Sequence, residues 1–413
     1  MKYSKLFTKT LKDAPADEQA RSAQLLIQAG FIHKEMAGVY TILPLGLNVL
    51  NNISNIIREE MDEIGGQELQ STALQRKELW EKTGRWDDEV VDNWFKTELK
   101  NGSELSLAFT HEEPMTDMMR SFIHSYKDLP AYPYDIRTVF RNEARAKSGV
   151  MRGREFFWKA LYSFSKDEKQ HEEFYTKATQ AYRNIFRRVG LGDSTYLTFA
   201  SGGTFAKYSH EFQTLCEAGE DVIYLDKSKE IAVNKEVYTD EVLKDLGLSR
   251  GDLVEAKAVE VGNIFSLGDK FSKPIGLAFS DENGDEKNVL MGCYGIGISR
   301  LVGVISELCA DESGIVWPES VAPYKYHIVT IARYEDDESF QKSEELYNRL
   351  VQRGDEVLWD ERIETRPGEK FADADLIGCP IRIVVSPKTL EQGNVEVKLR
   401  KEKESKLVEF DKV

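Results

Sequence analysis

The sequence contains little cysteine and little histidine. Its 413 residues include four cysteines and six histidines. Cys216, Cys293, Cys309 and Cys379 form no C-x-x-C pair, which argues against a disulfide framework or a structural zinc site. We expect reduced thiols.

Long apolar runs are also missing. The first residues, MKYSKLFTKTLKDAPADEQ, hold no apolar core of a signal peptide, and nowhere do about 18 apolar residues follow one another. Apolar residues at 41%, aromatic residues at 10% and charged residues at 31% are typical of a globular protein in water. We therefore expect a cytoplasmic protein that has no membrane partner.

Positive charge is scarce except in one stretch. The formal net charge is -16, which argues against nonspecific nucleic-acid binding by the whole surface. The segment FRNEARAKSGVMRGREFFWKALYSF, at residues 140–164, is the exception, with six Lys/Arg and two Glu between Arg141 and Lys159. A polyanion would have to be bound at a defined place, and this stretch is a candidate.

The order of expected elements favours two domains of different class. Helices are expected over 17–37, 47–64 and 168–188, and strands over 106–114, 134–144 and 155–164. Strands without a regular βαβ rhythm predict an α+β fold with a largely antiparallel sheet. Strand and helix alternate from residue 326 onward, after Pro318 and Pro323, so we expect domains at 1–319 and 320–413, the second a small α/β domain.

The basic stretch has residue types that suit a nucleotide pocket. Arginine is the side chain for fixed, bidentate contact with phosphate or carboxylate. If residues 136–144 and 155–164 are adjacent strands, Arg141 and Glu143 share one face of the first, and Phe156 and Trp158 share one face of the second. An arginine for phosphate, an aromatic ring for a base and an acid would form such a pocket. The alternative is a solvated basic hairpin.

A glycine-rich segment, NVLMGCYGIGISRLVGVISE at residues 288–307, is expected to be a strand that runs into a helix. The last glycine of a dinucleotide fingerprint is missing, because Arg300 stands at its place. Arg300 could instead contact a nucleotide from the side opposite Phe156. The third motif, Thr110-His111-Glu112-Glu113, offers a hydroxyl and a carboxylate for an ammonium group, or is simply an acidic turn. It has no second histidine at helical spacing, so zinc is not expected.

Taken together, the ordered segments resemble a class II aminoacyl-tRNA synthetase, and specifically the bacterial-type prolyl-tRNA synthetases. The resemblance runs from SKLFTKTLKDAP near the start to EQGNVEVKLR near the end. Its motifs are LPLG, FTHEE, FRNEARAKSGVMRGREF, SHEFQ, EVGNIF, GCYGIGISR, GIVWPESVAPY and RPGEKFADADLIGCP. It implies an antiparallel-sheet catalytic domain, an anticodon-binding C-terminal domain, and a homodimer, with which the apolar face of 47–64 is compatible.

The resemblance also implies roles for individual residues. Arg141 and Arg300 would be catalytic, binding ATP together with Glu143, Arg152, Phe156 and Glu260. Proline would be bound by Thr110, Glu112, Arg141, Trp158, Ser209, His210, Phe265 and Cys293. The tRNA would be contacted by Arg145, Asp360, Arg362, Arg366 and Lys370, whereas the lysines from Lys401 onward are expected to be a solvated tail. Mg²⁺ would arrive with ATP, and no protein ligand for it is assigned.

The implied reaction needs no side-chain nucleophile. The carboxylate of L-proline would attack the α-phosphorus of ATP, pyrophosphate would leave, and the terminal ribose of tRNA(Pro) would then take the proline. Positioning and charge stabilisation would do the catalysis.

Two departures from the family pattern matter. Only residues 222–259 stand where many relatives carry an editing domain, and they are too few for a hydrolytic domain with its own core. We therefore expect no hydrolysis of Ala-tRNA(Pro) by this chain, and a separate deacylase is considered as a partner. The second departure is at Trp158, Ala160, Ser165 and Asn263, which replace Met, Asp, His and His of the family motifs.

Two alternatives remain open at the level of sequence. One is a catalytically silent paralogue that binds tRNA or a regulatory partner. The other is a paralogue that activates a different amino acid, which Ala160 and Asn263 favour. Arg141, Glu112 and Arg300 are all present, and this favours the active ligase.

Overall fold

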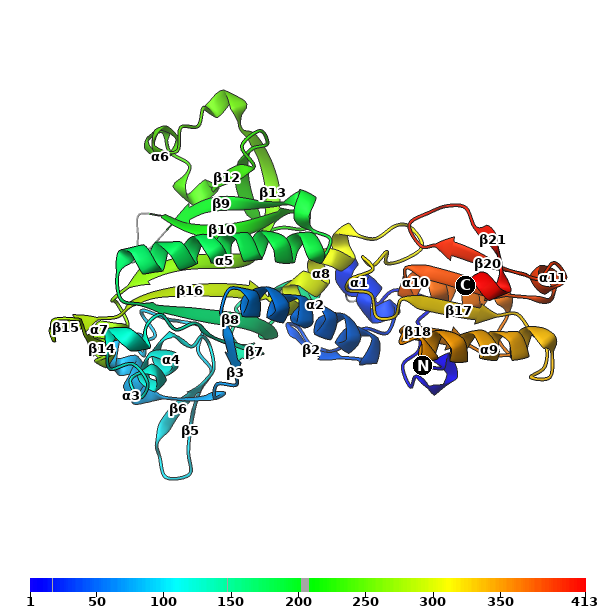
Figure 1. Ribbon diagram of the computed structural model, residues 1–413, viewed down its shortest axis with the longest axis horizontal. Coiled ribbons are helices and arrows are strands. Elements are labelled where there is room, and N and C mark those ends of the chain that lie inside the picture. The colour runs from blue at the N-terminus through cyan, green and yellow to red at the C-terminus, as the bar shows by residue number, and fades with distance from the viewer. Residues whose placement is uncertain (17, 147, 202–207) are drawn as a thin grey trace. The chain divides into compact units, whose positions relative to one another are not determined.

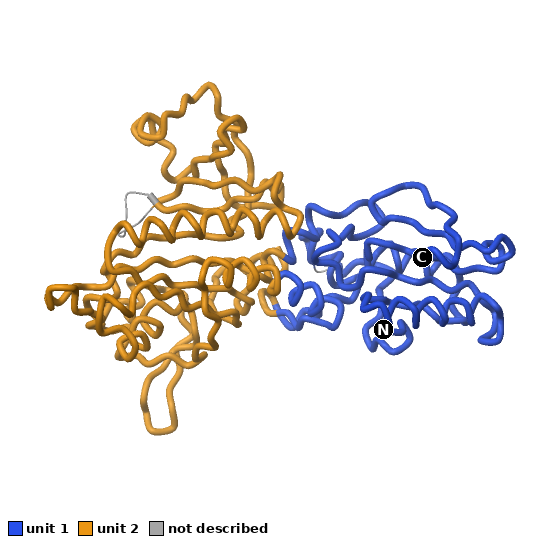
Figure 2. The backbone as a smooth tube through the Cα atoms, in the orientation of Figure 1, with its two compact units in different colours: residues 1–36, 40–53, 302–413 blue, residues 37–39, 54–301 orange. Residues whose placement is uncertain are grey.

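The structure is a computed structural model that describes residues 1–16, 18–146, 148–201 and 208–413. The chain divides into two compact units (Figure 2). The larger unit contains residues 37–39 and 54–301, and the smaller contains 1–36, 40–53 and 302–413. The smaller unit thus contains N-terminal residues as well as the C-terminal segment. The boundary between a catalytic and an anticodon-binding domain near residue 320 stays a prediction.

A mixed sheet organises the larger unit. Among the described residues it has nine strands in the order β10-β9-β12-β11-β13-β16-β8-β7-β3, antiparallel except at β12–β9 and β3–β7. The expected α+β class with a largely antiparallel sheet is confirmed. The strands are β3 (Gln67–Leu69), β7 (Pro133–Phe140), β8 (Glu155–Ser165), β9 (Thr195–Ser201), β10 (Tyr208–Leu215), β11 (Asp221–Asp226), β12 (Ile231–Asn234), β13 (Val254–Gly268) and β16 (Leu290–Gly297).

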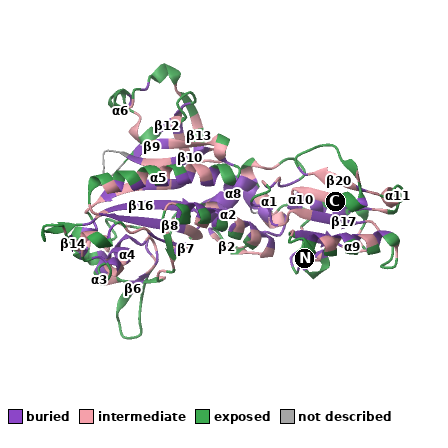
Figure 3. Cartoon of the chain, in the orientation of Figure 1, coloured by how far each residue is buried: buried purple, intermediate pink, exposed green. Residues whose placement is uncertain are grey.

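Helices and small sheets complete this unit. Helix α5 (Glu168–Arg188) packs along β8, β13 and β16 (Figure 1). Its apolar side chains Phe174, Tyr182, Ile185 and Phe186 are buried, and so are most residues of β8 and β16 (Figure 3). The remaining elements are α3 (Lys77–Lys82), α4 (Glu112–Met119), α6 (Asp240–Asp245), α7 (Ser272–Ile275), the sheet of β4 (Leu74–Arg76), β6 (Glu104–Leu107) and β5 (Lys96–Glu98), and the pair β14 (Ala278–Ser280) and β15 (Glu286–Asn288).

Residues 222–259 form a small lobe on the sheet. They comprise most of β11, then β12, α6 and the start of β13, and Figure 1 shows them projecting beyond β9 and β10. Val233, Leu243 and Leu248 are the buried members of the lobe's own apolar cluster. The segment therefore places β12 and β11 between β9 and β13 of the sheet and surrounds a minor core.

An α/β sheet forms most of the smaller unit. Residues 326–409 form five strands in the order β18-β17-β19-β20-β21, with β17, β18 and β19 mutually parallel. The bounds are β17 (Tyr326–Thr330), α9 (Glu338–Gln352), β18 (Val357–Asp360), α10 (Pro367–Ile377), β19 (Ile381–Val385), α11 (Pro387–Leu390), β20 (Asn394–Leu399) and β21 (Lys406–Glu409). The strand and helix alternation expected from the sequence is confirmed.

Two helices connect residues assigned to different units, and both begin in segments singled out in the sequence. Helix α2 (Pro44–Glu63) contains the expected apolar repeat, and α8 (Ile298–Leu308) follows β16 directly, as the glycine-rich segment predicted. The helix expected over 17–37 is wrong in extent. Helix α1 spans only Arg21–Gln28, Gly30 has a φ of +76°, and β1 (Ile32–Met36) then pairs with β2 (Val39–Ile42).

No helix among the described residues combines the length and the apolar character that crossing a bilayer requires. None of the four cysteines, all of which lie among the described residues, forms a disulfide.

Two glycines of the smaller unit provide a test of its packing. Gly378 ends α10 with a φ of +79°, and a Cβ added to it would lie 2.0 Å from the Ile315 carbonyl oxygen. Gly354 also has a positive φ, of +90°, but no atom lies within 4 Å of a Cβ added there. Gly378→Ala should lower the free energy of unfolding by about 2–4 kcal/mol, since strain and a clash add. Gly354→Ala should cost about 1 kcal/mol. Urea unfolding, followed by the fluorescence of the buried Trp317 and Trp359, measures both; equal losses would contradict this packing.

Candidate active site

Arg141 lies immediately after β7, where the ladder with the next segment continues. Its backbone N–H donates to the Arg154 carbonyl oxygen at 2.8 Å. Its guanidinium carbon lies 5.3 Å from the ring centroids of Phe109 and Trp158 and 5.4 Å from that of Phe156. Burial, and then the neighbouring Arg300 cation, lower the pKa of Arg141. Three aromatic rings therefore hold a cation that has few polar partners of its own.

Arg300 reaches the same cavity from a distant segment. It stands in the first turn of α8, and its Nε donates to the Met151 carbonyl oxygen at 2.9 Å. Its Nη1 donates to the Glu260 carbonyl oxygen at 2.5 Å and lies 3.6 Å from the Glu260 carboxylate. Arg141, Arg300, Glu143 and Glu260 line one cavity of ≈ 240 Å³. Two guanidinium groups facing one space favour an anionic ligand.

A third arginine in this cavity is already paired. Arg152 lies 3.0 Å from the Glu143 carboxylate and 2.6 Å from that of Glu220. These contacts are exposed enough to be weak individually, so a polyphosphate could replace them. Arg152 is thus available to an anion at the mouth of the cavity.

A compact polar group is centred on Glu112, whose carboxylate lies close enough to Arg141 to affect its pKa. The Thr110 hydroxyl donates to Glu112 Oε2 at 2.7 Å, and the Tyr162 hydroxyl donates to Glu112 Oε1 at 3.3 Å. The Cys293 thiol lies 3.5 Å from the same Oε1. Burial raises the pKa of Glu112, but the Arg85 cation and the Thr110 hydroxyl outweigh it, so the pKa lies below the usual value. An ionised carboxylate with directed donors around it is suited to bind an ammonium group.

Cross-strand pairing explains why these side chains meet. Tyr162 on β8 is opposite Cys293 on β16, which is opposite Phe265 on β13, so the three side chains form a row on one face of the sheet. In the next row Gly295 makes space. A Cβ there would lie 2.2 Å from the Trp158 ring and 2.7 Å from the Asn263 side-chain oxygen.

Ser209 and His210 lie on β10, farther along the sheet. The Ser209 hydroxyl donates to the Ser201 carbonyl oxygen at 2.8 Å, and His210 Nδ1 lies 2.6 Å from the Tyr175 hydroxyl. Burial lowers the pKa of His210 to about 4, so its ring is neutral near pH 7. The contacts described for these two side chains do not include the group around Glu112. Arg145 is exposed in the loop that follows β7.

The residues expected to read the tRNA separate into two groups in the smaller unit. Arg362 donates to Asp360 at 2.7 Å and to Asp373 at 2.8 Å, and its guanidinium carbon lies 4.0 Å from the Tyr3 ring centroid. Lys370 is buried and donates to the Thr330 carbonyl oxygen at 2.8 Å. These side chains therefore form an internal ion network.

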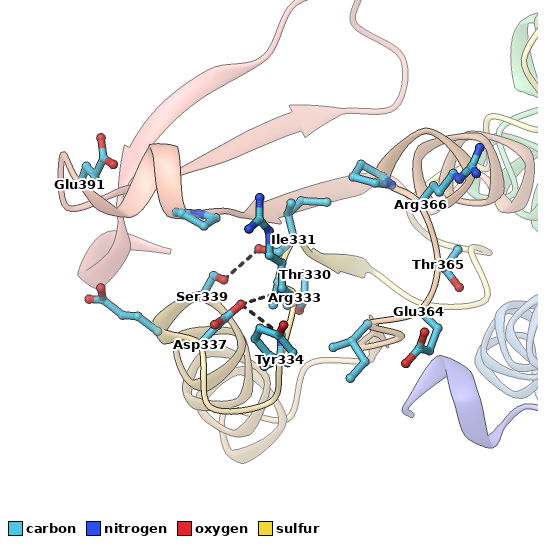
Figure 4. Close-up of a pocket in the computed structure, with 15 residues that line it drawn as sticks. Thr330, Ile331, Arg333, Tyr334, Asp337, Ser339, Glu364, Thr365, Arg366 and Glu391 are labelled. Carbon is cyan, nitrogen blue, oxygen red and sulfur yellow. Dashed lines mark hydrogen bonds between the residues drawn. The ribbon is translucent and has the colours of Figure 1, made fainter.

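Arg366, in contrast, lines an open cleft. The cleft has a volume of ≈ 1140 Å³ and lies between the loop after β17, the start of α10 and the start of α11. Figure 4 shows Arg366, Glu364 and Thr365 on one side and Arg333 and Tyr334 on the loop after β17. The Asp337 carboxylate accepts the backbone N–H groups of Arg333 and Tyr334 at 2.6 and 3.1 Å, which fixes this loop. Tyr334 is 66% exposed.

Several site residues were missed in the sequence. Arg85 pairs with Glu112 and Glu113, Tyr162 donates to Glu112, and Glu220 pairs with Arg152. The two adjacent acids in Thr110-His111-Glu112-Glu113 indicate that a cation should lie nearby. The sequence around Arg85, Gly84-Arg85-Trp86, does not indicate that Arg85 is that cation.

Among the described residues no three His, Cys, Asp or Glu side chains come together as a metal-binding group. The acids that line the Arg141 cavity are Glu143, Glu220, Asp221 and Glu260. Carboxylate oxygens are the ligand type that Mg²⁺ takes, but Glu143 and Glu220 each pair with Arg152. The donors suit a Mg²⁺ that is brought by a phosphate ligand.

Comparison with known proteins identifies two families. The tRNA synthetase class II core domain (G, H, P, S and T) matches residues 95–308, and an anticodon binding domain matches residues 321–413. A proline–tRNA ligase of Caulobacter vibrioides is 40% identical over 97% of this chain and 95% of the relative. Those of Phenylobacterium zucineum and Rickettsia africae are each 38% identical, over 100% and 97% of this chain and 98% and 96% of the relatives.

Solved structures share the fold. A prolyl-tRNA synthetase from Cryptosporidium parvum complexed with L-proline and AMP superposes with a TM-score of 0.75 at 18% identity, over 95% of this chain and 72% of that one. The same organism's enzyme with halofuginone and AMPPNP gives a TM-score of 0.78 at 18% identity, over 97% and 77%.

Proposed function

The chain belongs to the proline–tRNA ligases, class II aminoacyl-tRNA synthetases, and from this premise we propose that the Arg141 cavity joins L-proline to ATP before the proline passes to tRNA(Pro). Arg141 and Arg300 line one cavity, and Glu112, whose pKa is lowered, lies near Arg141. We assign the site on this arrangement.

Glu112 and Thr110 bind the secondary ammonium of proline, and Arg141 binds its carboxylate. The Thr110 and Tyr162 hydroxyls hold the Glu112 carboxylate by hydrogen bonds, so little reorganisation is needed when the ammonium arrives. Cys293, Phe265 and Trp158 provide the wall against the ring. The roles of Ser209 and His210 in this pocket stay predictions.

The nucleotide lies on the other side of Arg141. Phe156 stacks on the adenine, Glu143 lies near its exocyclic amine, Arg152 meets the γ-phosphate, and Arg300, held by Glu260, closes the nucleotide from the opposite side. Arg152 leaves Glu143 and Glu220 when the phosphate binds. Mg²⁺ bound to the phosphate oxygens would neutralise part of their charge, with Glu220, Asp221 and Glu260 as the oxygen donors present.

The first step is an in-line displacement. A proline carboxylate oxygen attacks the α-phosphorus, the bond to the bridging oxygen breaks, and pyrophosphate leaves with the electron pair. Arg141 contacts both the attacking carboxylate and the α-phosphate, so it holds the two reactants together as negative charge shifts between them. In the second step the terminal ribose hydroxyl of tRNA(Pro) attacks the prolyl carbonyl, and AMP leaves.

The tRNA is held at two places. Arg145, exposed in the loop after β7, reaches the acceptor end, and the cleft that Arg366 and Tyr334 line accepts anticodon bases. An exposed aromatic ring and cations at the ends of parallel strands suit stacking and phosphate contact. Asp360, Arg362 and Lys370 are not among the residues that line the cleft, and their polar atoms are engaged with one another, so their proposed role is to support the neighbouring loop that carries Arg366. We also propose that two copies of the chain form a homodimer through α2.

Editing in cis is not part of the proposed function. Residues 222–259 surround only a minor apolar cluster, and the lobe has no room for a separate hydrolytic domain. A deacylase acting in trans completes the proposal. A catalytically silent tRNA-binding paralogue is the rival from another class, and an intact set of Arg141, Glu112 and Arg300 disfavours it.

Proline-dependent exchange of pyrophosphate into ATP tests the function. The wild-type protein should catalyse it with proline and not with the other amino acids, except for a low rate with alanine. No exchange would support the silent paralogue, and exchange driven by a different amino acid would support a changed specificity. Arg141→Ala should slow exchange roughly a thousandfold or more, because several kcal/mol of transition-state stabilisation are lost.

Arg250→Ala is the matched control for Arg141→Ala. Arg250 is exposed and pairs with Asp240 at 2.6 Å in the lobe of residues 222–259, so exchange should be unchanged. Near-normal exchange by Arg141→Ala would refute its assigned role.

Hydrolysis of supplied Ala-tRNA(Pro) tests the absence of editing. The purified protein should release alanine at the spontaneous rate, because the lobe lacks a second site. The assay compares deacylation with and without protein. Release well above the rate without protein would show that an editing site exists.

Arg366→Met tests the anticodon cleft. Losing one charged contact costs about 1.5–3 kcal/mol, so KM for tRNA(Pro) in aminoacylation should rise at least tenfold while KM for proline stays unchanged. Arg353→Met is the control, since Arg353 is exposed, pairs with Asp355 and is not among the cleft residues. If the two variants had the same KM for tRNA(Pro), the anticodon would not bind in this cleft.

A further inference from the structure

Behind Glu112 lies a second, fully buried carboxylate. The side chain of Glu113 is 0% exposed. The Thr83 hydroxyl donates to Glu113 Oε1 at 2.7 Å, and Arg85 Nη1 donates to its two oxygens at 3.1 and 3.2 Å. Glu113 thus lies away from the substrate cavity yet within one residue of the group that binds the ammonium.

Arg85 is shared by the two carboxylates. The same Nη1 lies 3.3 Å from Glu112 Oε2, the oxygen that Thr110 also contacts. The Arg85 guanidinium carbon is held 5.0 Å from the Trp80 ring centroid and 5.3 Å from that of Phe271. A cation fixed between aromatic rings cannot follow one carboxylate and leave the other.

The group holds two buried carboxylates and one buried guanidinium, in a place where an unpaired charge is costly. Two further cations act on it, because the exposed Lys270 interacts with Glu113 and Arg141 interacts with Glu112. A bound ammonium adds another positive charge beside Glu112. Its attraction to the group is stronger when Glu113 is ionised than when Glu113 holds a proton, because protonation removes one of the two negative charges.

We propose that Glu113, acting through Arg85, sets the charge of the proline pocket, so that the ammonium of proline binds tightly only when Glu113 is ionised. This inference rests on the proposed function and extends it to two positioning residues that do not touch the substrate. Glu113 supplies a second negative charge behind Glu112, and Arg85 keeps Glu112 oriented toward the cavity.

The groups that face Glu113 decide its proton. Burial, and then the negative charge of Glu112, raise the pKa of Glu113 to about 7 against the opposing effect of Arg85. Charged or titratable groups face the pair from the segment after β7, the turn after α3, α4, β8, the segment before α7, and β16. They are Arg141, Arg85, His111, Glu112, Tyr162, Lys270 and Cys293. Burial lowers the pKa of His111 to about 4, and burial raises the pKa of Tyr162 and of Cys293, so none of these three titrates near 7.

Proline binding should depend on pH because Glu113 has a raised pKa in the empty pocket. The bound ammonium favours the ionised form of Glu113. Binding therefore releases a proton from Glu113 below pH 7 and releases none well above pH 7. KM for proline should therefore fall as the pH rises through about 7, by about eightfold between pH 6 and pH 7.5 for one ionisation. KM for ATP should change less than twofold over the same range.

The decisive experiment measures KM for proline in pyrophosphate exchange at saturating ATP from pH 6 to 8. Calorimetric titration with a nonhydrolysable prolyl-adenylate analogue, in buffers of different ionisation enthalpy, counts the protons released. The wild-type protein should release roughly half a proton or more at pH 6.5. Glu113→Gln, which keeps the Thr83 and Arg85 contacts possible, should release none and should show a high, pH-independent KM for proline.

Asp117→Asn is the matched control. Asp117 stands on the same helix, α4, and pairs on the surface with Arg76 and Arg120, so this variant should keep the wild-type pH profile and proton release. A flat KM profile together with no proton release by the wild-type protein would overturn the inference, whether or not Glu113→Gln folds. Absence of proline-dependent exchange at every pH would instead overturn the proposed function.

Discussion

The position of one guanidinium, that of Arg141, determines how the larger unit can work. Its backbone extends the β7–β8 ladder through Arg154, and its side chain is enclosed by Phe109, Phe156 and Trp158. Arg141 and Arg300 line the same cavity, and the Glu112 carboxylate lies close enough to Arg141 to affect its pKa. Because aromatic contacts rather than carboxylates hold Arg141, its charge remains available to an anion. In the proposed mechanism this availability allows one guanidinium to contact both the proline carboxylate and the α-phosphate.

The surrounding sheet makes that arrangement possible by pairing short and long side chains. The row of Tyr162, Cys293 and Phe265 comes from three different strands, and the row beneath it contains Gly295, whose missing Cβ leaves space for Trp158. Trp158 stands where the family has a methionine, and Asn263 where it has a histidine. Both side chains approach the same glycine, because a Cβ on Gly295 would lie 2.2 Å from the Trp158 ring and 2.7 Å from the Asn263 side-chain oxygen.

The sequence was sufficient for most elements but not for the contacts between them. Helix α5 and the strands around Arg141 were predictable because their apolar periodicity and glycine signals are local. The helix expected over 17–37 was wrong because Gly30 adopts a positive φ and the following residues pair as β1 and β2. Arg85 and Glu220 were not found, because their partners Glu113 and Arg152 are 28 and 68 residues away. Likewise Asp360, Arg362 and Lys370 resemble an exposed recognition set in the sequence, whereas tertiary packing turns them toward each other and Tyr3.

The polar contacts of the pocket cannot by themselves distinguish proline from smaller amino acids. In the proposed mechanism Arg141 binds the carboxylate, which every amino acid carries, and alanine also has an ammonium for Glu112 and Thr110. Selection would then arise from the wall formed by Trp158, Phe265 and Cys293, where a missing methylene changes the binding free energy by only about 1–3 kcal/mol. The proposed effect of Glu113 acts on the ammonium of both amino acids equally, so it would raise affinity without improving this ratio. A charge arrangement of this kind would therefore bind alanine as well as proline, which is why the proposal includes a deacylase acting in trans.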